Sequence, residues 1–292
     1  MVVGRVTARD RSTRIQRVLL GLLIANLAVV TAKFLIGIYS GSLAVLGDAV
    51  HASIDAMNNI LALIVIRVAS QEPDEDHPYG HTKFETLGAL TIVVFLSISG
   101  FELVKGAVTR LIRGSEPLDI SAAQVAVLLG TLVINSAVAL YEGRKGRELT
   151  SELLLADAAH TKADVVITAG VLIAVLLARA GYGWADPVVA LGVAGAIVVI
   201  AYGIVARSVP VLVDQQLVPA NRIRLTAEEI EGVASAYNIK SRGTPDQRFA
   251  ELTIAVDPNA TVDAAHQLAD EVESRLRERL GFHEIIVHIE PC

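Results

Sequence analysis

The chain has 292 residues, of which 53% are hydrophobic and 19% charged, and its formal net charge at pH 7 is −6. It is far more apolar than a soluble globular domain, in which about 25% of residues are charged. The negative charge and the absence of basic runs interleaved with aromatic residues argue against nucleic acid as a partner. The single cysteine, Cys292, excludes an intramolecular disulfide and a cysteine-based metal knuckle.

Six apolar segments are each long enough to cross a bilayer, which takes about 20 residues. They cover residues 18–38, 42–68, 86–109, 119–142, 152–178 and 186–210. The first is longer than the apolar region of a secretory signal, so we interpret it as a retained span. The sequence therefore predicts an all-α six-helix transmembrane bundle over 18–210, with an N-terminal arm over 1–17.

Basic residues predict how the bundle is oriented. Six spans place both termini on one side, and lysine and arginine are in excess on that side, which the positive-inside rule assigns to the cytoplasm. No histidine-rich loop or targeting peptide of the eukaryotic kind precedes or joins the spans. We therefore expect an integral protein of a bacterial inner (plasma) membrane, with the N-terminal arm and the C-terminal tail in the cytoplasm.

The tail over 211–292 has the composition of a soluble domain. Thr226 and Glu229 form a capping box that predicts a helix over 226–236. Residues 249–256 alternate as a half-buried strand does, Thr261 or Asp263 can cap a helix that ends before Gly281, and 284–289 predicts a last strand. The order helix, strand, strand, helix, strand indicates a small α+β domain, for which dimerisation is a way to bury more surface.

Two of the spans contain the same polar motif, in which a histidine precedes an aspartate by four residues. Residues four apart share one edge of a helix, so His51 with Asp55 and His160 with Asp164 each form a two-ligand edge. Such groups are costly in hydrocarbon, and their duplication indicates a binding site. Two facing edges would supply two nitrogens and two oxygens, which suits a tetrahedral divalent metal.

The alternative interpretation of these polar groups is helix-to-helix adhesion, for which Asn58, Asn59 and Asn135 are better candidates because they carry no charge. Two carboxylates balance one dication, so a loaded site is nearly neutral, whereas an empty site would take up protons. Competition between metal and protons makes an antiporter possible in principle. Two imidazoles disfavour Mg, Ca and Mn and favour Zn, followed by Cd, Co, Ni and ferrous iron.

The loop between the second and third spans is acidic and contains two histidines. Asp74, His77 and His81 make a nitrogen-and-oxygen metal site feasible there, while a solvated acidic loop is the alternative. With these motifs, the chain resembles the cation diffusion facilitator family of six-span divalent-metal antiporters over nearly its whole length. The resemblance is carried by the paired His-x-x-x-Asp motifs, by the Asp-His-Pro-Tyr-Gly-His-x-Lys-x-Glu loop over 76–85, and by Asp186-Pro187 at the start of the sixth span.

The resemblance implies roles for residues that the spacing alone does not assign. By it, the two motifs match the transport site, Asp74, His77 and His81 match a loop site, and Lys83 with Asp214 matches a charge pair between the third span and the tail. It also implies a homodimer that rocks between inward-facing and outward-facing states, and a metallochaperone-like tail. In that tail His266, His288 and Glu290 match metal-binding positions of some relatives, while Tyr237 and Thr253 replace histidines.

The resemblance also bears on the choice of metal. The histidine at position 51 resembles the residue of zinc-selective members of the family, whereas manganese-type members lack histidine in the paired motifs. The sequence thus predicts a secondary transporter, not an enzyme, that exports Zn²⁺ in exchange for protons. Zinc would be the substrate and a possible regulatory ligand. Fe²⁺, Co²⁺ or Cd²⁺ as cargo and a non-transporting metal sensor are the alternatives. The motifs of di-iron bundles and of intramembrane metalloproteases are absent from the spans.

Overall fold

The computed structural model describes residues 8–40, 43–113, 122–182 and 184–292, although several side chains in α1 and α2 are not described. The chain divides into two compact units, Met1–Ser208 and Val209–Cys292. The first contains the helices that the hydropathy predicts, and the second is an α+β unit. The first seven residues of the predicted N-terminal arm lie outside the described residues, and α1 begins at Ala8.

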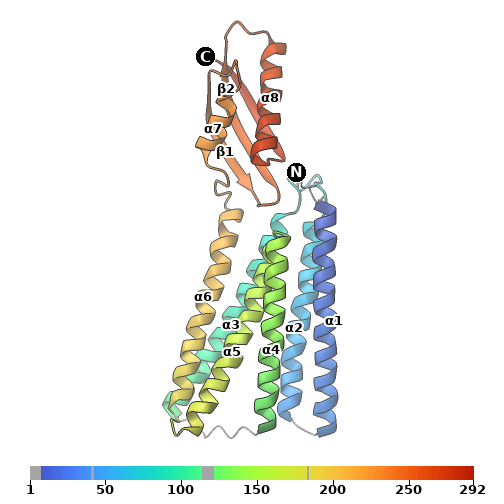
Figure 1. The fold of residues 1–292 in the computed structure, drawn as a ribbon, viewed down its shortest axis with the longest axis vertical. Helices are drawn as coiled ribbons and strands as arrows, with labels where there is room; N and C mark the ends of the chain where they lie inside the picture. Colours follow the sequence, from blue (N-terminus) through green and yellow to red (C-terminus); the bar gives the residue numbers. More distant parts are fainter. Residues whose placement is uncertain (1–7, 41–42, 114–121, 183) are drawn as a thin grey trace. The chain divides into compact units, whose positions relative to one another are not determined.

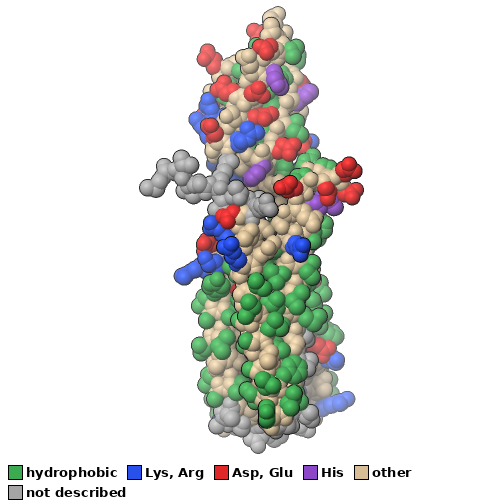
Figure 2. Space-filling view, turned by 90° about the vertical axis from the view of Figure 1, so that its right-hand side faces the viewer, with side chains coloured by type: hydrophobic (Ala, Val, Ile, Leu, Met, Phe, Trp, Pro, Cys, Tyr) green, Lys and Arg blue, Asp and Glu red, His purple; other side chains and the backbone are tan. Residues whose placement is uncertain are grey.

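Each of the six predicted spans is a helix. The helices are α1 (Ala8–Ser40), α2 (Leu43–Ala69), α3 (Lys83–Arg113), α4 (Ala122–Glu148), α5 (Glu152–Arg179) and α6 (Ala185–Leu212). Among the described residues, five are long and apolar enough to cross a membrane, and 56–69 of α2 forms a shorter apolar helix. Successive helices alternate in direction (Figure 1), and apolar side chains cover much of the helical face seen in Figure 2. The prediction of a helical transmembrane bundle is confirmed.

Tight packing between helices depends on small residues, as is usual in membrane proteins. The pairs α1–α2 and α4–α5 have the most extensive contacts, and α3 packs against α5 and α2. A Cβ atom on Gly88 of α3 would lie 2.5 Å from a methyl group of Val65 in α2, so the two helices approach too closely there for a larger residue. The helices are thereby held at short distances around a shared core.

The C-terminal unit is a three-stranded sheet with helices on one face. Its elements are α7 (Ala220–Glu228), β1 (Ser235–Gly243), β2 (Arg248–Val256), α8 (Val262–Leu280) and β3 (Glu284–Pro291). The central strand β2 pairs antiparallel with β1 and parallel with β3. Leu252 and Ile254 of β2 pack in one core with Val272 and Leu276 of α8. As predicted, the Thr261 side chain caps α8 by accepting from an N–H group, and Gly281 ends it with φ of +72°.

The first helix of this unit differs from its prediction. A helix over 226–236 is wrong, because α7 ends at Glu228 and β1 already begins at Ser235. The hydroxyl of Thr226 donates to the Arg222 carbonyl inside the helix, so it is not an N-cap. The residue at the N-cap is Pro219, whose carbonyl accepts the Arg222 N–H. Proline is well suited to the start of a helix because its φ is preset and it has no N–H to satisfy.

The β1–β2 hairpin supplies a test of the fold. Gly243 has φ of +123°, and an added Cβ would lie 2.1 Å from the Gln247 carbonyl oxygen. Gly243→Ala should therefore destabilise the hairpin by about 1–3 kcal/mol, the usual cost of a strained backbone. Amide hydrogen exchange of the full chain should accelerate in β1 and β2. Gly195→Ala in α6, where a Cβ meets nothing within 4 Å, is the control. Unchanged exchange in Gly243→Ala would contradict the described turn.

Candidate functional site

The second polar motif forms one edge of α5, as its spacing predicts. His160 Nε2 lies 3.9 Å from Asp164 Oδ2, and the two side chains are 12% and 21% exposed. Ser151, nine residues before His160, caps the helix by accepting from the Leu154 N–H, so the start of α5 at Glu152 is fixed. The edge therefore offers an imidazole nitrogen and a carboxylate oxygen at a depth that is largely closed to solvent.

The first motif lies in α2, but the side chains of His51 and Asp55 are outside the described part of the chain. A neighbouring side chain of α2 nevertheless reaches the α5 edge. The Asn58 amide nitrogen lies 3.5 Å from His160 Nε2 and can donate a hydrogen bond to that nitrogen in the tautomer that leaves it without a proton. Asn58 is buried and contacts a candidate ligand. The contact joins α2 to α5, as the interpretation of Asn58 as a helix-to-helix contact predicts, and it also places Asn58 next to the candidate site.

Sequence reasoning missed a buried acid of α4. Glu142 is 2% exposed and accepts a hydrogen bond of 2.9 Å from the Thr161 hydroxyl of α5. It interacts electrostatically with Asp157 and Asp164, both on α5. The signal available in the sequence was an acidic residue at the end of an apolar segment, one helix away from the second motif. The seam between α4 and α5 therefore carries three acids, of which Asp164 belongs to the candidate transport site and the other two lie beside it.

The acidic loop brings its three predicted ligands together. One ligand atom from each of Asp74, His77 and His81 lies within 4.8 Å of the others. Asp74 Oδ1 is 3.1 Å from His77 Nδ1, and Asp74 Oδ2 is 3.3 Å from His81 Nε2. The two imidazole rings lie 4.3 Å apart, and both contact the ring of Phe84. A carboxylate with two imidazoles is a donor set that suits zinc.

The loop also fixes the charge of its carboxylate. The His77 backbone N–H donates to Asp74 Oδ1 over 2.6 Å, and this bond is the largest cause of a lowered Asp74 pKa, with both imidazoles acting in the same direction. Ionised Asp74 therefore stabilises the folded chain. This contribution is complete above the ordinary pKa of 3.8 and is lost as the pH falls through the lower pKa of the folded chain. At neutral pH the carboxylate is therefore ionised and available to a cation.

The predicted ligands of the tail are divided between two faces. His288 Nε2 lies 3.5 Å from Glu290 Oε1 on β3. Tyr237 of β1 donates its hydroxyl proton to Glu290, and this bond raises the Tyr237 pKa. His266 lies on α8, which packs on the other face of the sheet, and it pairs with Asp270 at 4.0 Å. Within one described chain, the three predicted residues do not converge on one point.

The predicted pair of Lys83 and Asp214 joins residues of different units. Lys83 is the first residue of α3, and Asp214 follows α6 with φ of +54°. Within the C-terminal unit, Arg242 lies 3.8 Å from Asp214 and 4.0 Å from Glu251. The pair with Lys83 stays a prediction.

The geometry of the loop predicts the result of one substitution. Asp74→Asn removes the only carboxylate of the trio, so zinc binding to the loop should weaken at least about tenfold. An equilibrium zinc titration of the purified full chain would measure this loss. Asp76→Asn removes the same charge from the same loop without touching the trio and is the control. Equal losses in both variants would show that only the loop's net charge matters.

Comparisons with known proteins identify relatives of both units. Residues 19–213 match the model of the cation efflux transmembrane domain, and residues 219–292 match that of the cation efflux protein cytoplasmic domain. A protein named cation-efflux pump FieF, from Shewanella oneidensis, is 31% identical over 91% of this chain and 90% of its own length. An uncharacterized transporter of Methanocaldococcus jannaschii is 27% identical, covering 92% and 95%. The Bacillus subtilis manganese efflux system protein MneP is 26% identical, covering 97% and 98%.

These matches cover both units, and the matched segments coincide with the helical bundle and the α+β unit described above. The C-terminal unit is therefore cytoplasmic, and the helical unit is embedded in a membrane. The chain belongs to the cation diffusion facilitator, or cation efflux, family, and is a divalent-cation efflux transporter and not an enzyme.

Proposed function

We propose that this transporter exports Zn²⁺ from the cytoplasm in exchange for protons, with His51, Asp55, His160 and Asp164 as the transport site. The observation that carries the proposal is the contact between Asn58 of α2 and His160 of α5, next to the His160–Asp164 edge. It brings the two helices that bear the paired motifs together at the level of one of the motifs.

Helical spacing supports the contribution of α2. Positions 51 and 58 are seven residues apart and fall within about 20° of each other around an ideal helix, while position 55 is about 60° from position 58. All three positions therefore share the side of α2 from which Asn58 reaches His160. Two edges on facing helices would give a dication two nitrogens and two oxygens.

Charge balance supports the exchange for protons. Two carboxylates and one dication sum to zero, whereas two buried carboxylates without a metal leave a charge that hydrocarbon disfavours. Imidazole and carboxylate bind metal only in their deprotonated forms, so protons and metal compete for the same atoms. Export of the dication would thus be coupled to inward movement of protons.

The donor set favours zinc over the other cations. Manganese prefers carboxylate, carbonyl and water ligands, and the proposed site supplies two imidazoles. A relative named for manganese efflux is 26% identical, but the histidines of this chain argue for a different cargo. Fe²⁺, Co²⁺ and Cd²⁺ remain the alternative substrates. We also propose a homodimer in a bacterial inner membrane, with zinc as a regulatory ligand of the loop and of His288 and Glu290 in the tail.

The transport site is tested by removing one carboxylate from either helix. Asp164→Ala and Asp55→Ala should each abolish zinc-dependent proton flux in proteoliposomes, because the remaining groups cannot balance a dication. Gel filtration would verify that both variants fold, and Asp246→Asn in the cytoplasmic hairpin is the control. Retained flux in either folded alanine variant would refute the assignment of the site.

The cargo is tested in a single liposome preparation. Zinc should give the highest ratio of maximal rate to KM among Zn, Cd, Co, Fe and Mn, and manganese should give the lowest, because of the imidazole ligands. Metal uptake by a fluorescent indicator or by elemental analysis would measure these rates. A preference for manganese would contradict the proposed donor set.

A further inference from the structure

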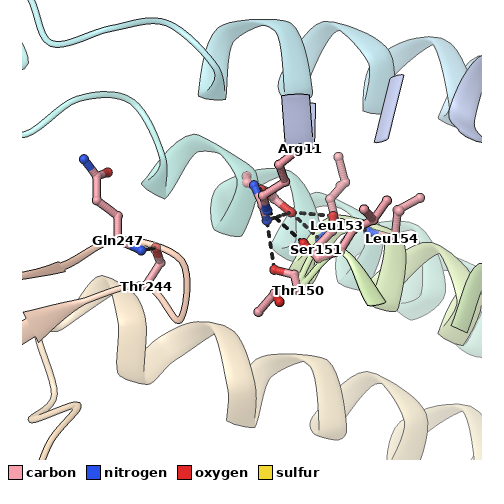
Figure 3. A network of polar contacts seen from close by, with 9 residues as sticks. Arg11, Thr150, Ser151, Leu153, Leu154, Thr244 and Gln247 are labelled. Carbon is pink, nitrogen blue, oxygen red and sulfur yellow. Dashed lines mark hydrogen bonds and ion pairs between the residues drawn. The ribbon is translucent and has the colours of Figure 1, made fainter. Parts of the chain in front are cut away.

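A buried polar cluster joins three segments that are far apart in the sequence. Arg11 of α1 contacts Glu85 of α3 through both terminal nitrogens, each 3.2 Å from Oε2. Its Nε and one terminal nitrogen donate to the carbonyls of Leu149 and Thr150, each over 2.8 Å. The Arg11 and Glu85 side chains are only 15% and 8% exposed. Figure 3 shows how the arginine reaches across to the turn between α4 and α5.

The same cluster holds the start of α5. Glu85 Oε1 accepts the Ser151 hydroxyl over 2.5 Å and lies 3.5 Å from the Leu153 nitrogen. The Ser151 oxygen accepts in turn from the Leu154 N–H. A helix N-terminus has unsatisfied N–H groups and favours a nearby anion. Glu85 therefore acts as a cap that α3 supplies to α5, and Arg11 balances its charge.

The cluster lies at the cytoplasmic end of the bundle. Successive helices alternate in direction, and α6 ends where the cytoplasmic unit begins (Figure 1). The beginnings of α1, α3 and α5 therefore share the cytoplasmic side with the end of α6. Around the cluster the helices are closely packed, since Leu154 and Ala156 of α5 have no exposed surface. A Cβ on Gly88, three residues after Glu85, would lie 3.2 Å from Leu153 Cδ1.

Movement at this end would be transmitted to the α5 edge. The helix is continuous from Glu152 to Arg179, and His160 lies nine residues beyond Ser151, or about 14 Å along the axis. Metal that arrives from the cytoplasm must pass the ends of these helices to reach His160. A separation of α5 from α1 and α3 at that end would open a route to His160, and the cluster opposes such a separation.

We propose that Arg11, Glu85 and Ser151 form a cytoplasmic latch, which holds α5 against α1 and α3 while the transport site is closed to the cytoplasm and opens for metal to load. Its role in transport rests on the proposed site in α5. The latch stabilises the state in which the transport site is closed to the cytoplasm. Weakening the latch therefore raises the fraction of molecules whose site is open to the cytoplasm. The apparent affinity for cytoplasmic metal then rises by the same factor.

Cysteine labelling tests the latch without metal. The exposed Cys292 is first replaced by serine, and Ala156→Cys then serves as a fully buried reporter at the cytoplasmic end of α5. In vesicles with the cytoplasmic face outward, an impermeant maleimide should react slowly with this parent. Glu85→Gln should accelerate the reaction at least about fivefold, the change in a two-state ratio expected from losing one hydrogen bond.

Two further variants keep the test decisive. Arg11→Lys keeps the charge but cannot bridge Glu85 and two carbonyls at once, so labelling should rise by a smaller factor. If gel filtration shows that Glu85→Gln does not fold, the labelling of Arg11→Lys decides the outcome. Glu148→Gln, which removes an exposed charge paired with Lys145 near the same turn, is the matched control and should label at the parent rate. Parent-rate labelling in the folded latch variants would overturn the proposal, as would equal acceleration in Glu148→Gln.

Zinc uptake into the same vesicles separates a latch from a structural contact. If the latch opens for loading, Glu85→Gln should lower the KM for zinc by the factor by which labelling accelerates. An unchanged KM with a reduced maximal rate would indicate a structural role and would overturn the proposal. Because labelling is measured without metal, faster labelling in a protein that does not move zinc would refute the proposed function and leave the latch standing.

Discussion

The whole arrangement depends on the cost of ionisable groups inside a lipid-spanning bundle. Hydrocarbon offers them no hydrogen bonds, so each must find partners among the other helices. The α5 edge is accordingly approached by Asn58 from α2, and Glu142 of α4 is held by the Thr161 hydroxyl. A bound dication would balance the negative charge of the acids, which these neutral partners cannot do.

Polar contacts join neighbouring helices at both ends of the bundle. At the cytoplasmic end, the latch ties α1 and α3 to the start of α5. At the opposite end, Arg110 of α3 contacts Asp186 at the start of α6 over 2.5 Å. A transporter needs contacts that can break, and polar contacts near the membrane surface suit that purpose because water can replace them.

The periodicity and hydropathy of the sequence were enough to predict the six helices, because ~20 apolar residues have few alternatives in a membrane. The edge formed by His160 and Asp164 follows from helical spacing alone. The first helix of the tail was misplaced because a good capping box at Thr226 competed with Pro219, and the proline determines the start. The sequence marks Glu142 only as an acid at the end of an apolar segment. The contacts of Glu142, Arg11 and Glu85 could not be predicted, since each partner lies 19 or more residues away in the chain.

The central claim is that one dication is bound by four side chains from α2 and α5. X-ray absorption of the full chain loaded with one equivalent of zinc, with Asp74→Asn removing the loop site, tests it most directly. The account predicts four nitrogen or oxygen ligands at about 2.0–2.2 Å with the outer-shell scattering of two imidazole rings, and a weaker imidazole signal in both His51→Ala and His160→Ala. A first shell of six oxygens, or one that neither histidine variant changes, would contradict it.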